Sequence, residues 1–240
     1  MRYFYLEDPV VDERAAISDV DQLHHLGDVL RLKTGDEITV FDSAGQEFLC
    51  SITDITRQHA LLKVIERRAV RPAKFKLAVA CALPKKSGLD DIVDKLTQIG
   101  VDIIIPLLTE RVMVKTEEAQ GSRLVRWRKI ARSAAEQSQR NTLPAIPGIL
   151  SFQDLLSESA GYGIKLIPTL DGNRQSLQKV LTNKMPESVL VLIGPEGDFT
   201  PQEVEQAVSA GFQPVTLGNN VLRVETAAVA AAAYIKLALG

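Results

Sequence analysis

Short apolar runs alternate with helical patterns from residue 75 onward, and this alternation restricts the possible fold more than any other feature of the chain. The strand-like runs are 75–83, 103–108, 164–169, 188–193 and 214–217. Nearly continuous apolar strands with helices between them are typical of a mostly parallel sheet that helices cover on both faces. The sequence therefore predicts an α/β fold for this part of the chain.

Helix-start signals locate the helices between these strands. Ser87 and Asp90 have the spacing of a capping box, and an apolar stripe follows them. A second helix is expected at about 122–139. TPQE (200–203) combines an N-cap, a proline in the first turn and a capping-box glutamate. The last predicted helix, 225–239, is rich in alanine and apolar nearly all round.

Residues 1–70 are predicted to form a small β-rich barrel with one early helix. Ser18 and Asp21 suggest a capping-box start for that helix. Three strand-like runs follow, at 37–41, 47–55 and 59–65. The charged, proline-containing stretch 66–76 is the expected linker. The predicted domains are thus 1–70 and 71–240.

Composition indicates an ordinary globular protein with a substantial core, because 45% of the 240 residues are hydrophobic and 24% are charged. The start of the chain lacks the pattern of a signal peptide, and no apolar stretch approaches the roughly 20 residues that span a bilayer. Cys50 and Cys81 lie in strand-like runs, without ligand-like spacing to histidines. We therefore expect a cytoplasmic protein with buried free thiols and no structural metal.

Basic residues cluster in two stretches, although the formal net charge is −2. From Lys63 to Lys86 the only acid is Glu66, and basic residues also outnumber acids from Glu110 to Arg140. Both stretches are compatible with a nucleic-acid partner. A solvated helix face and a charged linker would have the same composition, so charge alone leaves both interpretations open.

Glycine-containing turns follow the last three predicted strands. They are 169–172 (TLDG), 194–197 (GPEG) and 218–220 (GNN). Ligands of open α/β sheets bind beyond the carboxyl ends of the strands, where glycines let the backbone approach closely. Apolar walls suited to a flat aromatic such as adenine would come from Leu170, Ile193, Leu217 and Leu222. Ordinary turns are the alternative, since any α/β domain has several.

Several common signatures are missing. The turn after the first strand of the α/β part reads ALPKKSG (82–88) and is not a glycine-rich dinucleotide loop. The chain has neither a Walker A motif nor a GxSxG nucleophile elbow. A nucleotide-like site is therefore expected in the C-terminal half, and the usual signatures of phosphoryl transfer and serine hydrolysis are lacking.

A combination of motifs resembles the RsmE family of the SPOUT superfamily. The paired C-terminal segments IGPEGDFTPQEVEQA (193–207) and LGNNVLRVETAAVAA (217–231) carry most of the resemblance. Upstream, Lys85, DKLTQIGV (94–101), TER (109–111), AAEQSQRNTLP (134–144) and HHLGDVLRLKTGD (24–36) occur in the family's order. Asp198 stands where a second glycine is usual, Gln98 replaces a usual acid, and Asn219-Asn220 stand where a basic residue is common.

This resemblance implies a SPOUT fold with a deep C-terminal trefoil knot, a PUA-like N-terminal barrel and a homodimer. It implies methylation of uridine N3 in small-subunit (16S) ribosomal RNA, free or in an assembled particle, with S-adenosyl-L-methionine as cofactor. The implied cofactor-binding residues are Thr169, Leu170, Ile193, Gly194, Pro195, Glu196, Gly197, Leu217, Gly218, Asn219, Val221, Leu222 and Thr226. The implied RNA-binding residues are His24, His25, Arg31, Lys85, Glu136, Gln137 and Arg140.

The resemblance also places Arg223 and Glu225 near the transferred methyl group. Neutral uridine N3 is a poor nucleophile, so a base or a cation that stabilises its anion is needed there. Arg223 would stabilise the developing negative charge, and Glu225 would accept a proton or hold Arg223. A helix-start carboxylate with an ion-pair partner is the alternative for both.

Other interpretations stay open at this point. Arg128, Arg132, Glu136 and Arg140 have i, i+4 spacing, which fits either a surface ion-pair ladder or an RNA-phosphate face in which Glu136 holds two arginines. For the whole protein, the alternatives are a ribose 2′-O-methyltransferase of the same superfamily and a non-catalytic RNA-binding assembly factor.

Overall fold

The computed structural model describes residues 2–69, 73–84, 88–112, 118–170 and 172–240. Lys85, Ser87 and the centre of the expected linker lie outside these ranges. Residue contacts divide the chain into two compact units. Unit 1 comprises Met1–Pro72 and Arg132–Leu143, and unit 2 comprises Ala73–Ala131 and Pro144–Gly240. No helix in the part of the chain that the structure describes is long and apolar enough to cross a membrane.

Unit 2 is built on a seven-stranded sheet of order β10-β12-β9-β11-β6-β7-β8. Every strand pair in it is parallel, as the alternation of strands and helices predicts. The strands are β6 (Lys76–Ala82), β7 (Ile103–Leu108), β8 (Leu150–Ser151), β9 (Ile164–Pro168), β10 (Gln175–Ser176), β11 (Ser188–Ile193) and β12 (Gln213–Thr216). The sequence did not predict the edge strands β8 and β10, because two residues show no periodicity.

The helices that the sequence predicted in this region are confirmed within a few residues. The helices are α2 (Gly88–Ile99), α3 (Glu118–Ser138), α4 (Phe152–Glu158), α5 (Leu177–Leu181), α6 (Pro201–Ser209) and α7 (Val224–Leu239), with a 3-10 turn at Ser159–Gly161. The sequence analysis missed α4 and α5, which are too short to show a full amphipathic pattern.

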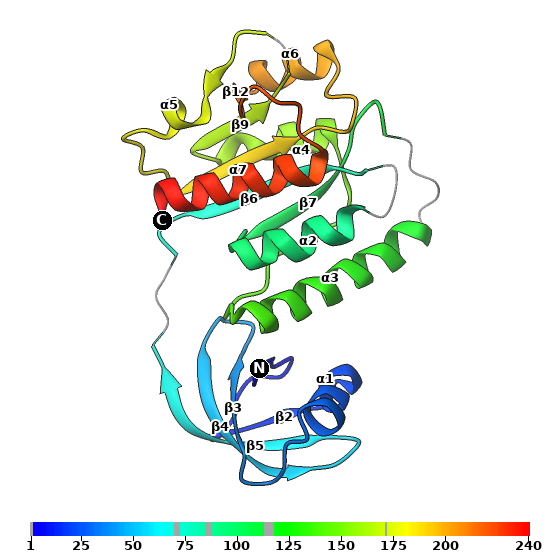
Figure 1. The fold of residues 1–240 in the computed structure, drawn as a ribbon, viewed down its shortest axis with the longest axis vertical. Helices are drawn as coiled ribbons and strands as arrows, with labels where there is room; N and C mark the ends of the chain where they lie inside the picture. The colour runs from blue at the N-terminus through cyan, green and yellow to red at the C-terminus, as the bar shows by residue number, and fades with distance from the viewer. Residues whose placement is uncertain (1, 70–72, 85–87, 113–117, 171) are drawn as a thin grey trace. The chain divides into compact units, whose positions relative to one another are not determined.

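Helices cover both faces of this sheet, and the alternation of side chains along β6 shows how. Leu77 and Val79 pack with α2, α5 and α7, whereas Ala78 and Ala80 pack with α4 and α6. In Figure 1, α2 and α7 lie together in front of the sheet, and α4 and α6 lie behind it. The expected α/β architecture, with a doubly covered parallel sheet, is confirmed.

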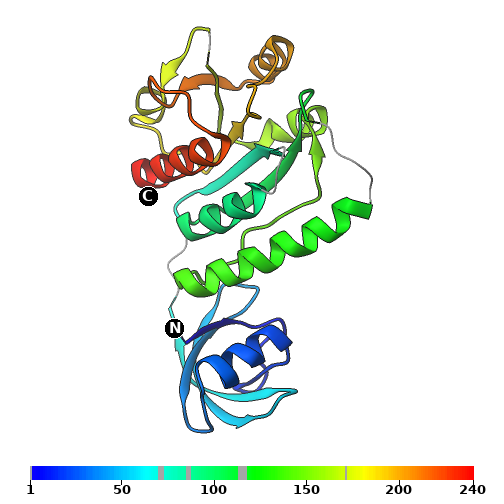
Figure 2. The ribbon, with the colours of Figure 1, turned by 45° about the vertical axis from the view of Figure 1, so that its right-hand side comes forward.

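Unit 1 contains a five-stranded sheet of order β1-β3-β4-β5-β2. Only β1 and β3 pair in parallel; the other pairs are antiparallel. The elements are β1 (Tyr3–Tyr5), β2 (Arg14–Ile17), α1 (Val20–His24), a π-helical turn (His25–Val29), β3 (Glu37–Phe41), β4 (Glu47–Ile55) and β5 (Ala60–Arg68). Figure 2 shows the early helical segment against this sheet, where Leu23 and Leu26 enter its core.

Two local predictions for this unit are wrong. β5 continues to Arg68 and pairs with β4 there, so 66–68 belong to the sheet and not to the linker. The last three residues of this strand are all charged and none is buried, so the sequence shows no apolar alternation there. The N-cap of α1 is Asp19, whose carboxylate accepts from Gln22 N–H at 3.0 Å, and not Ser18.

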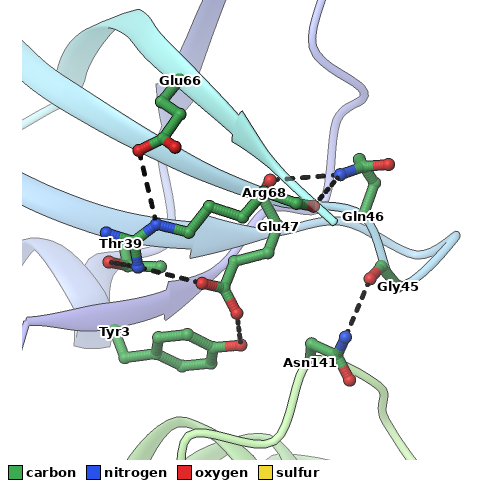
Figure 3. Close-up of polar contacts among 8 residues, drawn as sticks. All are labelled: Tyr3, Thr39, Gly45, Gln46, Glu47, Glu66, Arg68 and Asn141. Carbon is green, nitrogen blue, oxygen red and sulfur yellow. Dashed lines mark hydrogen bonds and ion pairs between the residues drawn. The ribbon is translucent and has the colours of Figure 1, made fainter. Parts of the chain in front are cut away.

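The chain segment 132–143 packs against β1 and β3 within unit 1. Ala135 forms a small apolar cluster with Tyr3 and Phe41, whose rings stack at 5.1 Å. Asn141 donates a hydrogen bond to the carbonyl of Gly45 at 3.2 Å (Figure 3). The end of α3 and the residues after it therefore complete the core of a unit that lies mostly at the start of the chain.

Candidate active site

A pocket in unit 2 lies among the turns that follow β9, β11 and β12. In the sheet, β9 lies between β12 and β11, and all three strands run parallel. Their carboxyl ends therefore meet at one edge, where α/β sheets bind ligands. The pocket is lined by Pro168, Thr169, Leu170, Arg174, Ile193, Gly194, Pro195, Glu196, Asp198, Thr216, Leu217, Gly218, Asn220, Val221, Leu222, Val224 and Ala227.

Most of the residues that the resemblance assigned to cofactor binding line this pocket, but three of them do not. Those three are Gly197, Asn219 and Thr226. Arg174, Asp198 and Asn220, which were not assigned, take part in the lining. Arg174 lies two residues after the predicted 169–172 turn, and no motif singled out its side chain.

Two of the pocket turns contain glycines at positions where a side chain would be unfavourable. Gly218 has a φ of 127°, which favours glycine, and a Cβ there would meet nothing within 4 Å. At Gly194 a Cβ would lie 3.1 Å from the ring of Phe199, so the GPEG turn packs closely on that side chain. The two turns therefore need glycine for different reasons, one for its backbone conformation and the other for space.

A second hollow adjoins this pocket and holds the two predicted catalytic residues. Arg223 and Glu225 line it together with Asp91 of α2. The two hollows share Glu196, Val221, Leu222 and Val224 as lining residues. Arg223 is the N-cap residue of α7, and Glu225 lies in its first turn. The start of α7 thus lies between the pocket of the strand-end turns and a hollow that contains Arg223 and Glu225.

Cys81 lies at the end of β6 and is fully buried. Burial, together with the negative charges of Glu196 and Glu225, raises the pKa of its thiol to about 12. The thiol is therefore neutral at physiological pH and cannot act as a nucleophile. Cys50 is a free thiol in the core of unit 1. The prediction that both cysteines are buried is confirmed.

Glu203, predicted only as a capping-box residue, also holds the segment that follows the GPEG turn. Glu203 of α6 is buried and accepts hydrogen bonds from the backbone N–H groups of Thr200 and Glu110, both at 2.9 Å. Thr200 donates its hydroxyl to Glu110 at 3.2 Å. The capping box of α6 therefore also joins the turn after β11 to the end of β7.

The predicted RNA-binding residues of unit 1 occupy different environments. His24, His25, Arg31 and Gln137 are exposed, Arg140 and Glu136 are half-buried, and Lys85 lies outside the described residues. His24 contacts Asp28 at 2.7 Å, and burial against neighbouring residues lowers the pKa of His25. His25 begins a π-helical turn, a distortion that often accompanies functional sites.

Glu136 is half-buried and its carboxylate is engaged with groups of unit 1. Its carboxylate accepts from the side chain of Gln22 at 2.6 Å and from Tyr5 N–H at 3.1 Å. Arg132 instead pairs with Glu7 at 2.7 Å and Asp19 at 2.6 Å. In this structure Glu136 and Arg132 hold the end of α3 on the sheet of unit 1.

Part of the first basic stretch is also engaged within unit 1. Arg68 donates to Glu47 at 3.1 Å, and Tyr3 donates its hydroxyl to the other carboxylate oxygen at 3.0 Å (Figure 3). Burial and the charge of Glu47 raise the pKa of Tyr3 well above its usual range. Arg68 is therefore committed to a contact between strands and is less available to a phosphate.

Comparisons with known proteins cover nearly the whole chain. An RNA methyltransferase domain family matches residues 71–236, and an RNA methyltransferase PUA domain family matches residues 17–65. The ribosomal RNA small subunit methyltransferase E of Synechocystis sp. is 36% identical over 91% of this chain and 71% of the relative. The protein of the same name from Bacillus subtilis is 31% identical over 86% and 84%.

A solved structure agrees with these matches. The ribosomal RNA small subunit methyltransferase E of Neisseria gonorrhoeae, bound to S-adenosylmethionine, is 29% identical and superimposes with a TM-score of 0.88. The superposition covers 99% of this chain and 97% of that one. On the sequence matches and on the shared fold, this chain belongs to the ribosomal RNA small subunit methyltransferase E family.

Proposed function

We propose that the protein transfers the methyl group of S-adenosylmethionine to N3 of a specific uridine in small-subunit ribosomal RNA. The observation that carries the proposal is the pair of adjoining hollows in unit 2. One has apolar walls and backbone turns, and the other contains Arg223 and Glu225. Family membership and the cofactor bound in the Neisseria gonorrhoeae relative support it.

The residues of the first pocket fit S-adenosylmethionine. Leu170, Ile193 and Leu217 offer apolar surface to an adenine ring. The sulfonium and ammonium groups of the cofactor are positive, and Glu196 supplies a carboxylate in the same pocket. When bound, the cofactor supplies a methyl group that is already activated on sulfur.

The side chains of the second hollow would then act on the uridine. N3 must lose its proton before it attacks the methyl carbon, and a nearby cation lowers the free energy of the anion. Arg223 serves as that cation, while Glu225 accepts the N3 proton or orients Arg223. Leu222 and Val224 line both hollows and contribute apolar surface where the two adjoin.

The finer features of the fold are part of the same proposal. We assign residues 1–70 and 71–240 to a PUA-like domain and a SPOUT domain, with 132–143 contributing to the core of the first. The segment after β11 forms a trefoil knot; the resemblance to the SPOUT superfamily implies it, and membership of the family supports it. Two copies form a homodimer, and ribosomal RNA as substrate places the enzyme in the cytoplasm.

Contacts with RNA are proposed for exposed residues of the PUA-like domain and the end of α3. These are His24, His25, Arg31, Gln137 and Arg140, together with Lys85 from the SPOUT domain. Glu136 acts there by holding the end of α3, since its carboxylate is engaged with Tyr5 and Gln22. Gly197 and Asn219, in the turns beside the cofactor pocket, and Thr226, in the first turn of α7, remain proposed cofactor contacts.

Labelled methyl transfer to unmethylated small subunits, and separately to naked ribosomal RNA, tests the proposal. We expect 3-methyluridine on nucleoside mass spectrometry of the product. Arg223→Met should lower kcat by about a hundredfold, because it removes a cation that stabilises the anionic transition state. Lys179→Met, which removes an exposed cation from α5, is the matched control and should retain wild-type activity. A 2′-O-methylated product, or no transfer to either substrate, would contradict the proposal.

A further inference from the structure

One peptide unit of the pocket is held from both of its sides. The carbonyl of Thr169 accepts a hydrogen bond from the guanidinium of Arg174 at 2.8 Å. The N–H of Leu170, which belongs to the same peptide, donates to the carboxylate of Asp198 at 2.9 Å. This peptide directly follows β9, and all four residues that form or hold it line the pocket.

Asp198 is itself fixed by its surroundings. It has a φ of 60°, in the left-handed region that aspartate tolerates better than most residues. Its second carboxylate oxygen accepts from Phe199 N–H at 2.9 Å, and its own N–H donates to Pro195 at 3.0 Å. Arg111, after β7, donates to the carbonyls of Gly197 and Asp198. The carboxylate is thus presented to Leu170 from a turn held at several points.

We propose that Asp198 and Arg174 are positioning residues that hold the Thr169–Leu170 peptide, and with it the Leu170 wall, in the orientation that binds the cofactor. The inference rests on the function proposed above. Leu170 is 43% exposed, so apolar packing does little to hold it in place. A peptide after a strand end, with its polar groups open to water, can rotate freely, and ordering it on binding costs affinity. Asp198 and Arg174 order this peptide before the cofactor binds, so binding does not incur that free-energy cost.

Asp198→Gly is the most direct test, because glycine accepts the positive φ and only the carboxylate is lost. The dissociation constant of S-adenosylhomocysteine, measured by calorimetry, should rise about tenfold, as expected for loss of a hydrogen bond to a charged group. Asp198→Asn, which keeps one acceptor oxygen, should give an intermediate value. Glu205→Gln removes an exposed charge from α6 and is the control that should bind as the wild type does.

Arg174→Met and the double variant with Asp198→Gly separate this role from a merely structural one. Both side chains act on one peptide, so the double variant should bind little more weakly than either single variant. The KM for S-adenosylmethionine should rise in all three, while kcat at saturating cofactor stays at the wild-type value. A change in kcat with an unchanged KM contradicts a positioning role.

The possible outcomes are distinct. If the wild type binds S-adenosylhomocysteine and Asp198→Gly binds it equally well, the inference fails and the proposed function stands. Additive losses in the double variant also overturn the inference. If the wild type does not bind the ligand, the proposed function fails and the inference fails with it. Should the glycine variant not fold, the asparagine variant decides in its place: wild-type affinity overturns the inference, and weakened affinity supports it.

Discussion

Glu136 illustrates how far a single side chain can depart from what its spacing suggests. Its position four residues from Arg132 and Arg140 fits a surface ladder, yet its carboxylate is directed at Gln22 and at the backbone of Tyr5. Burial raises the pKa of this carboxyl, and the hydrogen bonds and Arg132 only partly oppose that effect. The ionised form of Glu136 is therefore less favourable in the folded protein than in the unfolded chain.

We predict that Glu136→Gln retains or increases stability at neutral pH, whereas Glu136→Ala lowers it by about 1–3 kcal/mol, because alanine leaves two buried donors without an acceptor. The sign of the pH dependence follows from the raised pKa. Protonated Glu136 stabilises the folded state. Its contribution to the free energy of unfolding is complete below the unfolded-state pKa of 4.5 and is lost as pH rises through the folded-state pKa. Urea unfolding over a pH series should show this loss in the wild type and not in Glu136→Gln. An equal pH dependence in the two proteins would contradict the prediction.

At the level of elements, α6 is the helix whose start the sequence described best. The predicted N-cap, proline and capping-box glutamate are all confirmed at Thr200, Pro201 and Glu203. The tertiary structure adds a second role, since Glu203 also accepts from Glu110 N–H at the end of β7. A local motif thus serves as a link between two strand ends beside the pocket.

Thr200→Val should destabilise unit 2 by about 1–2 kcal/mol, because the N-cap oxygen and its hydrogen bond to Glu203 N–H are lost. Thr200→Ser keeps the hydroxyl and is the matched control, with an expected change of only a few tenths of a kcal/mol. Thermal unfolding followed by the fluorescence of Trp127, which lies in unit 2, measures both. Equal unfolding midpoints for the valine and serine variants would show that the cap contributes nothing.

At the level of the whole molecule, unit 1 is discontinuous in sequence. Residues 132–143 supply Ala135 to the cluster with Tyr3 and Phe41, and supply Arg132 and Glu136 to polar contacts with the same unit. A boundary drawn at residue 70 therefore separates these residues from partners that they cover or bind.

We predict that a fragment of residues 2–69 is poorly folded by itself and exposes Tyr3 and Phe41. Adding 132–143 through a flexible linker should restore dispersed amide signals in its NMR spectrum, since burial of each aromatic contributes about 1.5–3 kcal/mol. A linked segment carrying Glu136→Ala and Ala135→Asp is the control and should not restore them. A well-dispersed spectrum from 2–69 alone would contradict the prediction.

Sequence alone determined the longer strands, the main helices, the parallel sheet and the family, because periodicity, capping and motif order depend on residues that are close together in the chain. It missed the short strands β1, β2, β8 and β10. It did not determine that Arg174 and Asp198 act on one peptide, that Asn220 and not Asn219 lines the pocket, or that 132–143 belongs to unit 1. These features depend on which strands lie side by side and on the direction of each side chain. Packing between segments that are distant in the sequence decides these features, and local sequence patterns do not show that packing.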